Sequence, residues 1–207
     1  VRLTAQSERR REMISIVEWR MTQCLARGVS FRFNTWAEAA TIHDENPDVV
    51  IIATGGLPHT EILSAGNELV VSTWDIISGD VKPGRNVLLF DDAGDHAALQ
   101  AAEFIAKTEE KIEIMTPDRT FAPEVMAMNL VPYMRSLQAL DTTFTVTFRL
   151  LAVEREGAEL LATIDSDYGS ARKVRRVDQV AINHGKRPLD ELYLELKPAS
   201  RNARVVE

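Results

Sequence analysis

A largely β-branched run at residues 48–53, DVVIIA, constrains the fold more than any other feature of the chain. An uninterrupted apolar run of this length fits a strand that is covered on both faces, and such strands belong to parallel sheets flanked by helices. The run passes into Thr54-Gly55-Gly56, and a glycine turn at the carboxyl end of a strand exposes backbone amides where ligands of open α/β sheets bind. We therefore expect an α/β fold with Ala53, Thr54, Gly55 and Gly56 as the cofactor-binding turn.

Composition and charge exclude several classes of protein. The chain has 207 residues, of which 45% are hydrophobic and 27% charged, as in ordinary globular proteins with one or two α/β units. Its net charge of -7 disfavours sequence-independent binding to nucleic acid, which needs clustered Lys and Arg. No apolar run approaches the roughly 20 residues that cross a bilayer, and no signal segment opens the chain. We expect a cytoplasmic protein with neither a nucleic-acid nor a membrane partner.

The cysteine and the histidines form no recognisable metal or nucleophile pattern. Cys24 is the single cysteine, so it forms no internal disulfide, and its helical spacing with apolar residues predicts a buried structural thiol. His43, His59, His96 and His184 show no pair at helical spacing. We therefore predict no metal ligands and no catalytic residues within this sequence.

Hydrophobic periodicity and turn residues divide the chain into expected elements. The 3.6-residue pattern predicts helices at residues 6–27, 36–43, 96–107 and 123–140, and a short helical tail within 188–196. Apolar runs predict strands at residues 29–33, 48–53, 69–72, 86–90, 111–115 and 179–183. Three alternating stretches predict an antiparallel meander at residues 150–154, 160–165 and 172–177. Pro83-Gly84 is a strong turn signal and an expected domain boundary.

The order of these elements carries a family resemblance. The segments that carry it are residues 48–56, 71–75, 87–104, 116–119 and 178–193. Together they resemble the C-terminal, nucleotide-binding half of the trimethylamine dehydrogenase and 2,4-dienoyl-CoA reductase family of NADH:flavin oxidoreductases. The resemblance implies a Rossmann-like parallel sheet domain with a three-stranded antiparallel meander, plus an incomplete FAD-type nucleotide-binding domain.

The resemblance also implies a domain plan and a set of cofactors. Residues 1–82 would form a partial FAD- or ADP-type domain, residues 83–178 an inserted NAD(P)-type domain, and residues 179–207 a return segment to the first domain. FAD or ADP would bind at the Thr54-Gly55-Gly56 turn. FMN and a 4Fe-4S cluster would belong to an N-terminal barrel domain, which would be a partner of this region, with an electron-transfer flavoprotein as a further partner. Because the family's first glycine-rich loop and final Gly-Asp motif are missing, and because the chain starts at Val1, we expect an excised piece that is inactive alone.

The loop of the second nucleotide-binding unit departs from the dinucleotide pattern. Such loops read Gly-x-Gly-x-x-Gly, so that the backbone approaches a pyrophosphate at a helix N-terminus. Here Asp91, Ala93 and His96 replace all three glycines, and three carboxylates crowd the phosphate position. At about 5–7 Å and an effective dielectric near 20, each like-charge contact costs on the order of 2–3 kcal/mol. We expect no ordinary NAD(P) binding here, and these acidic residues fit helix capping equally well.

Other single residues point to ordinary structural roles. Thr116 stands where an acidic residue would hold the ribose of a dinucleotide. Arg119 could meet a 2′-phosphate but is more typical of a surface residue. His184 is expected to be solvated in a turn, and Trp36 and Trp74 are expected to close cores rather than stack on a cofactor.

Two functional hypotheses from different classes follow. The first is a region of a flavin-dependent oxidoreductase that acts on a small amine or enoyl-type substrate, with this region binding FAD or ADP. The alternative is a non-catalytic interaction module that docks an electron-transfer partner or the barrel domain of its parent.

Overall fold

The chain forms two compact units. The structure is a computed structural model that describes residues 1–108, 110–140, 142–199 and 204–206. Unit 1 combines Val1–Glu18 with Pro58–Gly185, and unit 2 combines Trp19–Leu57 with Lys186–Glu207.

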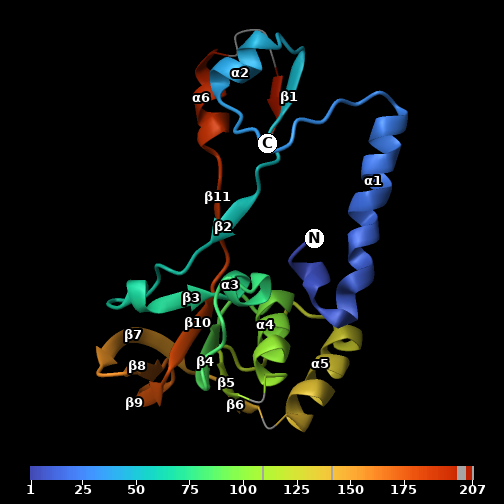
Figure 1. Ribbon diagram of the computed structural model, residues 1–207. Helices are drawn as coiled ribbons and strands as arrows, with labels where there is room; N and C mark the ends of the chain where they lie inside the picture. The colour runs from blue at the N-terminus through green and yellow to red at the C-terminus, as the bar shows by residue number, and fades with distance from the viewer. Residues whose placement is uncertain (109, 141, 200–203, 207) are drawn as a thin grey trace. The chain divides into compact units, whose positions relative to one another are not determined.

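Unit 1 is built on a five-stranded parallel sheet with the strand order β3-β10-β4-β5-β6 (Figure 1). Its strands are β3 Val70–Ser72, β4 Asn86–Asp91, β5 Lys111–Met115, β6 Thr143–Thr145 and β10 Gln179–Asn183. In the register of the two central strands, Ala181 of β10 lies beside Leu89 of β4. Both central strands are almost entirely buried, as their continuous apolar sequences require.

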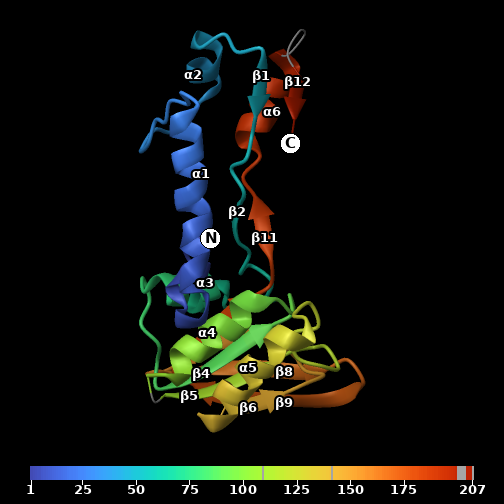
Figure 2. The same cartoon turned by 90° about the vertical axis from the view of Figure 1, so that its right-hand side faces the viewer.

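The two faces of this sheet are covered by different elements. Successive residues of a strand point to opposite faces. Val87 and Leu89 pack with the helices, whereas Leu88 and Phe90 pack with the antiparallel meander (Figure 2). The helices are α3 Thr73–Ser78, α4 His96–Ala106 and α5 Ala127–Ala139, and the meander strands are β7 Arg149–Glu156, β8 Glu159–Ser166 and β9 Gly169–Val177. The predicted Rossmann-like sheet with its three-stranded meander is therefore confirmed.

Side chains fix where the helices of unit 1 begin. Before α3, Ser72 and Asp75 form a reciprocal capping box, in which the Ser72 hydroxyl accepts from the Asp75 amide at 3.2 Å. Before α4, the Asp95 carboxylate accepts from the Ala97 amide at 2.8 Å. Pro132 lies inside α5.

The N-terminal segment differs from the single helix expected at residues 6–27. It forms two short 3-10 helices, η1 Thr4–Gln6 and η2 Glu8–Met13, before α1 Ile14–Ala26 begins. No residue of α1 is buried, and Cys24 is only half-buried. The predicted burial of Cys24 is wrong because the apolar side of α1 is only partly covered.

Unit 2 contains one short helix pair and two small sheets. Its elements are α2 Ala39–Asp44, β1 Val49–Ile51, β2 Gly56–Pro58, β11 Lys186–Pro188, α6 Glu191–Ala199 and β12 Arg204–Val206, with Pro58 counted in unit 1. β1 pairs in parallel with β12, and β2 pairs with β11. The expected strand at residues 29–33 is not formed, and the helix expected at 36–43 starts three residues later.

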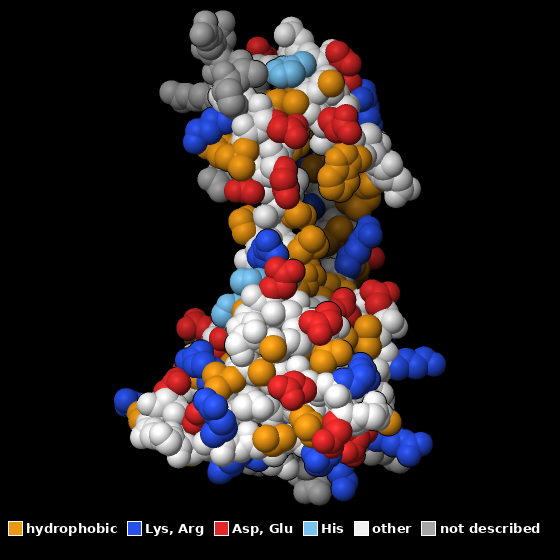
Figure 3. Space-filling view, turned by 90° about the vertical axis from the view of Figure 1, so that its left-hand side faces the viewer, with side chains coloured by type: hydrophobic (Ala, Val, Ile, Leu, Met, Phe, Trp, Pro, Cys, Tyr) orange, Lys and Arg blue, Asp and Glu red, His pale blue; other side chains and the backbone are white. Residues whose placement is uncertain are grey.

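Apolar side chains in unit 2 are more exposed than their sequence pattern predicts. Val49 and Ile51 are 55% and 76% exposed, although the run was expected to be covered on both faces. Among the described residues β1 pairs only with β12, and its Val50 side is partly covered while its Val49 and Ile51 side is exposed. Trp36 is 83% exposed, which contradicts the expectation that it closes a core. Several apolar side chains of this unit are seen at the surface in Figure 3.

The compact units have different limits from the expected domains. β3 lies within the expected range 1–82 and β10 within 179–207, yet both join the sheet that contains β4 of the range 83–178. Parallel strands brought together by crossovers need not be neighbours in sequence. The assignment of the three ranges to nucleotide-binding domains stays a prediction, because compactness does not report which nucleotide a domain binds.

Candidate functional site

The predicted cofactor-binding turn is held by the segment that follows β11. The Thr54 hydroxyl donates to the Leu189 carbonyl, and the Leu189 amide donates to the Gly55 carbonyl at 3.0 Å. Gly55 has φ +71°, a conformation that side chains with a β-carbon rarely adopt. A β-carbon on Gly56 would lie 2.6 Å from the carbonyl oxygen of Arg187. Gly56 is therefore required by the close approach of Arg187, and Gly55 is favoured by its positive φ.

A pocket of about 760 Å³ lies beside this turn in unit 2. Its wall is formed by residues 35–40, Thr54, Leu189, Glu191, Leu192 and Glu195. Of the four predicted cofactor-binding residues, Thr54 lines the pocket, and Ala53, Gly55 and Gly56 do not. The volume falls within the range of about 300–1,000 Å³ that is usual for small-molecule sites.

The pocket wall has a distinct chemistry. Trp36 is an aromatic residue of the wall, the Glu38, Glu191 and Glu195 carboxylates are hydrogen-bond acceptors, and none of the described residues that line the wall is Lys or Arg. Such a wall suits an aromatic group that carries hydroxyl or amino donors, and it repels phosphate. The three Glu residues of the wall were not predicted from the sequence, because no local pattern places them beside Thr54.

In unit 1, the buried Asp91 occupies the loop where a dinucleotide pyrophosphate would be expected. The Asp91 side chain accepts from the Gly94 amide at 3.0 Å and from the Asn183 side-chain amide at 2.9 Å. Burial raises the pKa of Asp91 to about 6, the hydrogen bonds from Asn183 and Gly94 oppose this shift, and the charges of Asp95 and Asp92 add to it. This carboxyl group is thus a fixed structural element of the loop.

The rest of the β4–α4 loop is also occupied by its own side chains. Asp95 caps α4 and accepts from Asn183 Nδ2 at 3.0 Å. A β-carbon on Gly94 would lie 2.6 Å from the ring of Pro123, so the loop is packed closely on its other side. Four amides of this segment are already bonded within the chain: those of Gly94 and Ala97 donate to carboxylates, and those of Asp92 and Ala93 donate to the Asn183 carbonyl.

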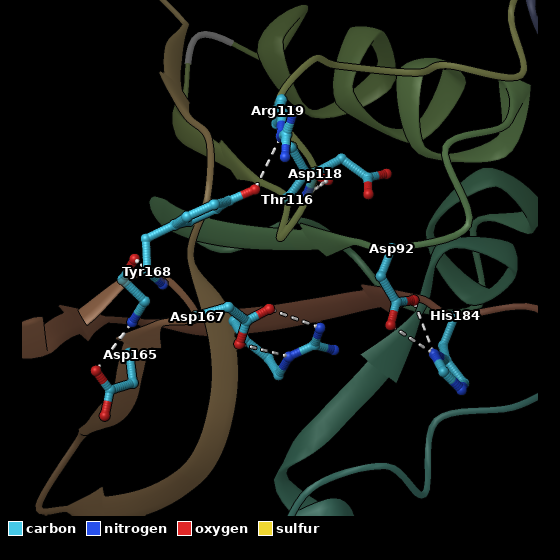
Figure 4. A network of polar contacts seen from close by, with 10 residues as sticks. Asp92, Thr116, Asp118, Arg119, Asp165, Asp167, Tyr168 and His184 are labelled. Atoms are coloured by element: carbon cyan, nitrogen blue, oxygen red, sulfur yellow. Dashed lines mark hydrogen bonds and ion pairs between the residues drawn. The ribbon is translucent and has the colours of Figure 1, made fainter. Parts of the chain in front are cut away.

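His184 joins the same edge of the sheet through Asp92 (Figure 4). Its Nδ1 atom lies 2.7 and 2.8 Å from the two Asp92 carboxylate oxygens, and its ring meets that of His59 edge-on at 5.2 Å. The expectation of a merely solvated turn histidine is therefore wrong. His184 follows β10 and Asp92 follows β4, and no local pattern in the chain indicates that these strands are neighbours.

The remaining polar residues at this edge are paired with one another. Arg119 is exposed, as expected, and its Nε donates to the Tyr168 hydroxyl at 3.0 Å (Figure 4). Arg149 Nη2 lies 3.0 Å from Asp167 Oδ2, which lowers the pKa of Asp167. Thr116 is buried and accepts from the amide two residues further on. Arg119 is thus engaged by Tyr168 rather than held towards a 2′-phosphate.

Comparison with known proteins decides the family. No family model matches the chain. The chain is 74% identical over 202 residues to a probable N-methylproline demethylase of Rhizobium meliloti, which covers 98% of this chain and 30% of that protein. The chain is homologous to the C-terminal region of the trimethylamine dehydrogenase and 2,4-dienoyl-CoA reductase family. The family resemblance inferred from the sequence is confirmed.

One further relative supports this assignment to the trimethylamine dehydrogenase family, and one solved structure shares the fold. The chain is 37% identical to the N,N-dimethylglycine/sarcosine dehydrogenase of Chromohalobacter salexigens, over 98% of this chain and 30% of that protein. The 6-hydroxypseudooxynicotine amine oxidase of Pseudomonas geniculata shares the fold, with a TM-score of 0.85 at 19% identity over 99% of this chain and 32% of that one. The chain spans about 30% of the length of the curated relatives it matches. Over this length it is homologous to the corresponding region of the trimethylamine dehydrogenase and 2,4-dienoyl-CoA reductase family.

Neither a membrane-crossing helix nor a cluster of metal-binding side chains is found among the described residues. None of the described helices is both long and apolar enough to cross a membrane. Within the same residues, no group of three or more His, Cys, Asp or Glu side chains is placed to hold a metal ion.

Proposed function

We propose that this region binds the adenosine end of FAD or ADP in a flavin-dependent amine oxidoreductase. The observation that carries the proposal is the pocket of about 760 Å³ whose wall includes Thr54, at the carboxyl end of the strand β1. Ligands of open α/β sheets bind outside the carboxyl ends of their strands.

The chemistry of the pocket wall fits the adenosine end of the nucleotide better than the pyrophosphate. The Trp36 ring can stack on an adenine, and the carboxylates of Glu38, Glu191 and Glu195 can accept from ribose hydroxyls or an amino group. A pyrophosphate does not fit this acidic wall, so it would lie outside, towards the Gly55 turn. When bound, FAD would carry electrons between redox centres, whereas ADP would have only a structural role.

The relatives suggest the substrate class of the whole protein. One is named for N-methylproline and another for N,N-dimethylglycine and sarcosine. By this likeness, the parent of this region would oxidise the N-methyl group of a small amino acid. That chemistry would take place on FMN, with a 4Fe-4S cluster, in an N-terminal barrel domain, and an electron-transfer flavoprotein would accept the electrons.

The Rossmann-like sheet of unit 1 would contribute structure rather than a second nucleotide site. Its β4–α4 loop satisfies its own amides through Asp91 and Asp95. The same observation favours the second candidate, in which unit 1 is an interaction module that docks the barrel or an electron-transfer partner. The two roles are compatible, because they lie in different units.

The nucleotide content of the full-length parent tests the proposal. Replacing Trp36 with Ala should lower retained FAD or ADP about tenfold, since aromatic stacking on a base contributes about 1–3 kcal/mol. Trp19→Ala is the matched control, because Trp19 is also exposed in unit 2 but lies outside the pocket wall. Equal nucleotide content in both variants and the parent would refute an adenosine site at this pocket.

A further inference from the structure

A basic segment near the N-terminus lies on helices α4 and α5 of unit 1. This segment, residues 4–13, is named the strap here and consists of η1 and η2. The Gln100 side-chain amide donates to the Thr4 carbonyl at 2.9 Å. Arg9 Nη2 lies 2.5 Å from Glu103 Oε1, and the Arg9 guanidinium stands over the Tyr133 ring at 5.0 Å. The strap therefore contacts both helices through polar and charged groups.

Arg10 adds contacts at the first turn of α4. Its Nε donates to the Tyr133 hydroxyl at 3.2 Å, and its Nη2 lies 2.8 and 3.0 Å from the two ring nitrogens of His96. Burial and the positive charge of Arg10 lower the pKa of His96, and Asp95 opposes this shift. Of the groups that face His96, Arg10 comes from the strap, Asp95 from the β4–α4 loop and Tyr133 from α5. His96 is thus held neutral beneath the strap.

Burial differs sharply between the strap and the surface beneath it. No strap residue is buried, whereas Gln100 and Glu103 are each 5% exposed and Tyr133 is fully buried. Lifting the strap would return the polar groups of these three residues to water, where their hydrogen bonds are replaced by solvent. Removing only Arg9 would instead leave the Glu103 carboxylate covered and unpaired, which is strongly unfavourable. We therefore expect the open strap to be energetically accessible. A closed strap that lacks the Arg9 cation is expected to be energetically unfavourable.

We propose that the strap is a charge-dependent latch that closes on α4 and α5 and can be released. Closure depends on the ion pair between Arg9 and Glu103. It also depends on the contact between the Arg10 guanidinium and the neutral ring of His96. Because protonated His96 and Arg10 repel each other, closure is favoured at higher pH and weakened as the pH falls through the titration of His96. Release would free the start of α1, which begins at Ile14 directly after the strap.

Trypsin cleavage after Arg10 in the 207-residue chain tests the latch. Each rate is divided by that of a free peptide of the strap sequence under the same conditions, which removes the dependence of trypsin itself on pH and salt. Glu103→Gln and Arg9→Ala should each raise the relative rate about tenfold or more, since cleavage follows the open population. Arg11→Ala is the matched control, because Arg11 is exposed and outside these contacts, and its rate should stay within about twofold of wild type.

Two further measurements, on a charge-swapped variant and on the wild-type chain, distinguish release of the latch from a general loss of stability. The double variant R9E/E103R should recover most of the protection lost in the single variants, and 1 M NaCl should speed cleavage of the unaltered chain. Far-UV circular dichroism should stay unchanged in the single variants. The proposal would be overturned if trypsin cleaved the wild-type chain as fast as the free peptide. It would also be overturned if the relative cleavage rate did not change with Glu103→Gln, with salt or with pH.

Discussion

The side-chain amide of Asn183 donates to the buried carboxyl group of Asp91 at 2.9 Å, across the boundary between the neighbouring strands β10 and β4. The carboxyl ends of two parallel strands are where an α/β sheet would bind a ligand. Here that position is bridged by the chain itself. Because burial raises the pKa of Asp91, the stability of unit 1 depends on the protonation of this group, and the hydrogen bond from Asn183 reduces that dependence.

Asp91→Asn should stabilise the protein near neutral pH. The folded-state pKa of Asp91 is about 6, above its ordinary value of 3.8, so its stabilising contribution is complete below about pH 4 and is lost as the pH rises through about 6. That loss is on the order of 3 kcal/mol, and an asparagine oxygen can still accept from Gly94 and Asn183. Urea unfolding between pH 4 and 8 should show an advantage of the variant that grows up to about pH 6. Asp178→Asn, at an exposed carboxylate, should show no such trend.

Gly66→Ala should destabilise unit 1 much more than Gly79→Ala. Both glycines have φ +84°, so both substitutions incur the same backbone strain of about 1 kcal/mol. A β-carbon on Gly66 would lie 1.9 Å from the Val153 carbonyl oxygen, whereas one on Gly79 meets nothing within 4 Å. Thermal melting should separate the two variants by several degrees. Equal melting temperatures would contradict the close approach of Gly66 to β7.

Gly55→Val in the full-length parent should lower the retained FAD or ADP. A β-branched residue resists φ +71° and would disturb the turn that carries Thr54. Gly55→Asn is the matched control, since Asn tolerates this conformation and nothing lies within 4 Å of the added β-carbon. Nucleotide content and melting temperature are measured on the same preparations. Lower stability with unchanged nucleotide content in Gly55→Val would limit Gly55 to a structural role.

NADH and NADPH should bind this region no more tightly than about the millimolar range, because carboxylates already occupy the phosphate position of the β4–α4 loop. Calorimetric titration of the 207-residue chain measures this directly. A micromolar dissociation constant that falls further in Asp92→Lys, which replaces one loop carboxylate with a cation, would show that the loop accepts a dinucleotide.

Several elements could be predicted because their signals are local. The apolar run of β4 alternates between two buried faces, and the stretches of the meander alternate between apolar and polar residues with glycine turns between them. These patterns follow from the two-residue period of a strand. Part of the candidate site could also be predicted from a local pattern. Thr54 follows the β-branched run at the carboxyl end of β1, and it lines the pocket.

Other expectations failed where they depended on neighbours. The run of β1 predicts a strand covered on both faces, yet Ile51 is 76% exposed, because burial is decided by which elements pack against a strand. Trp36 carries no signal that distinguishes a core residue from a pocket wall. From the sequence alone, His184 resembles a turn residue. Its contact with Asp92 follows only from the pairing of β10 with β4.

The sequence by itself determined the local elements, the parallel character of the main sheet and the relationship to flavin-dependent oxidoreductases, because periodicity and motif order are properties of the chain. Only the tertiary structure decided that Asn183 and His184 meet Asp91 and Asp92, and that Arg9 reaches Glu103. These partners are separated by about ninety residues, and their pairing depends on strand order and helix packing, which no local pattern encodes.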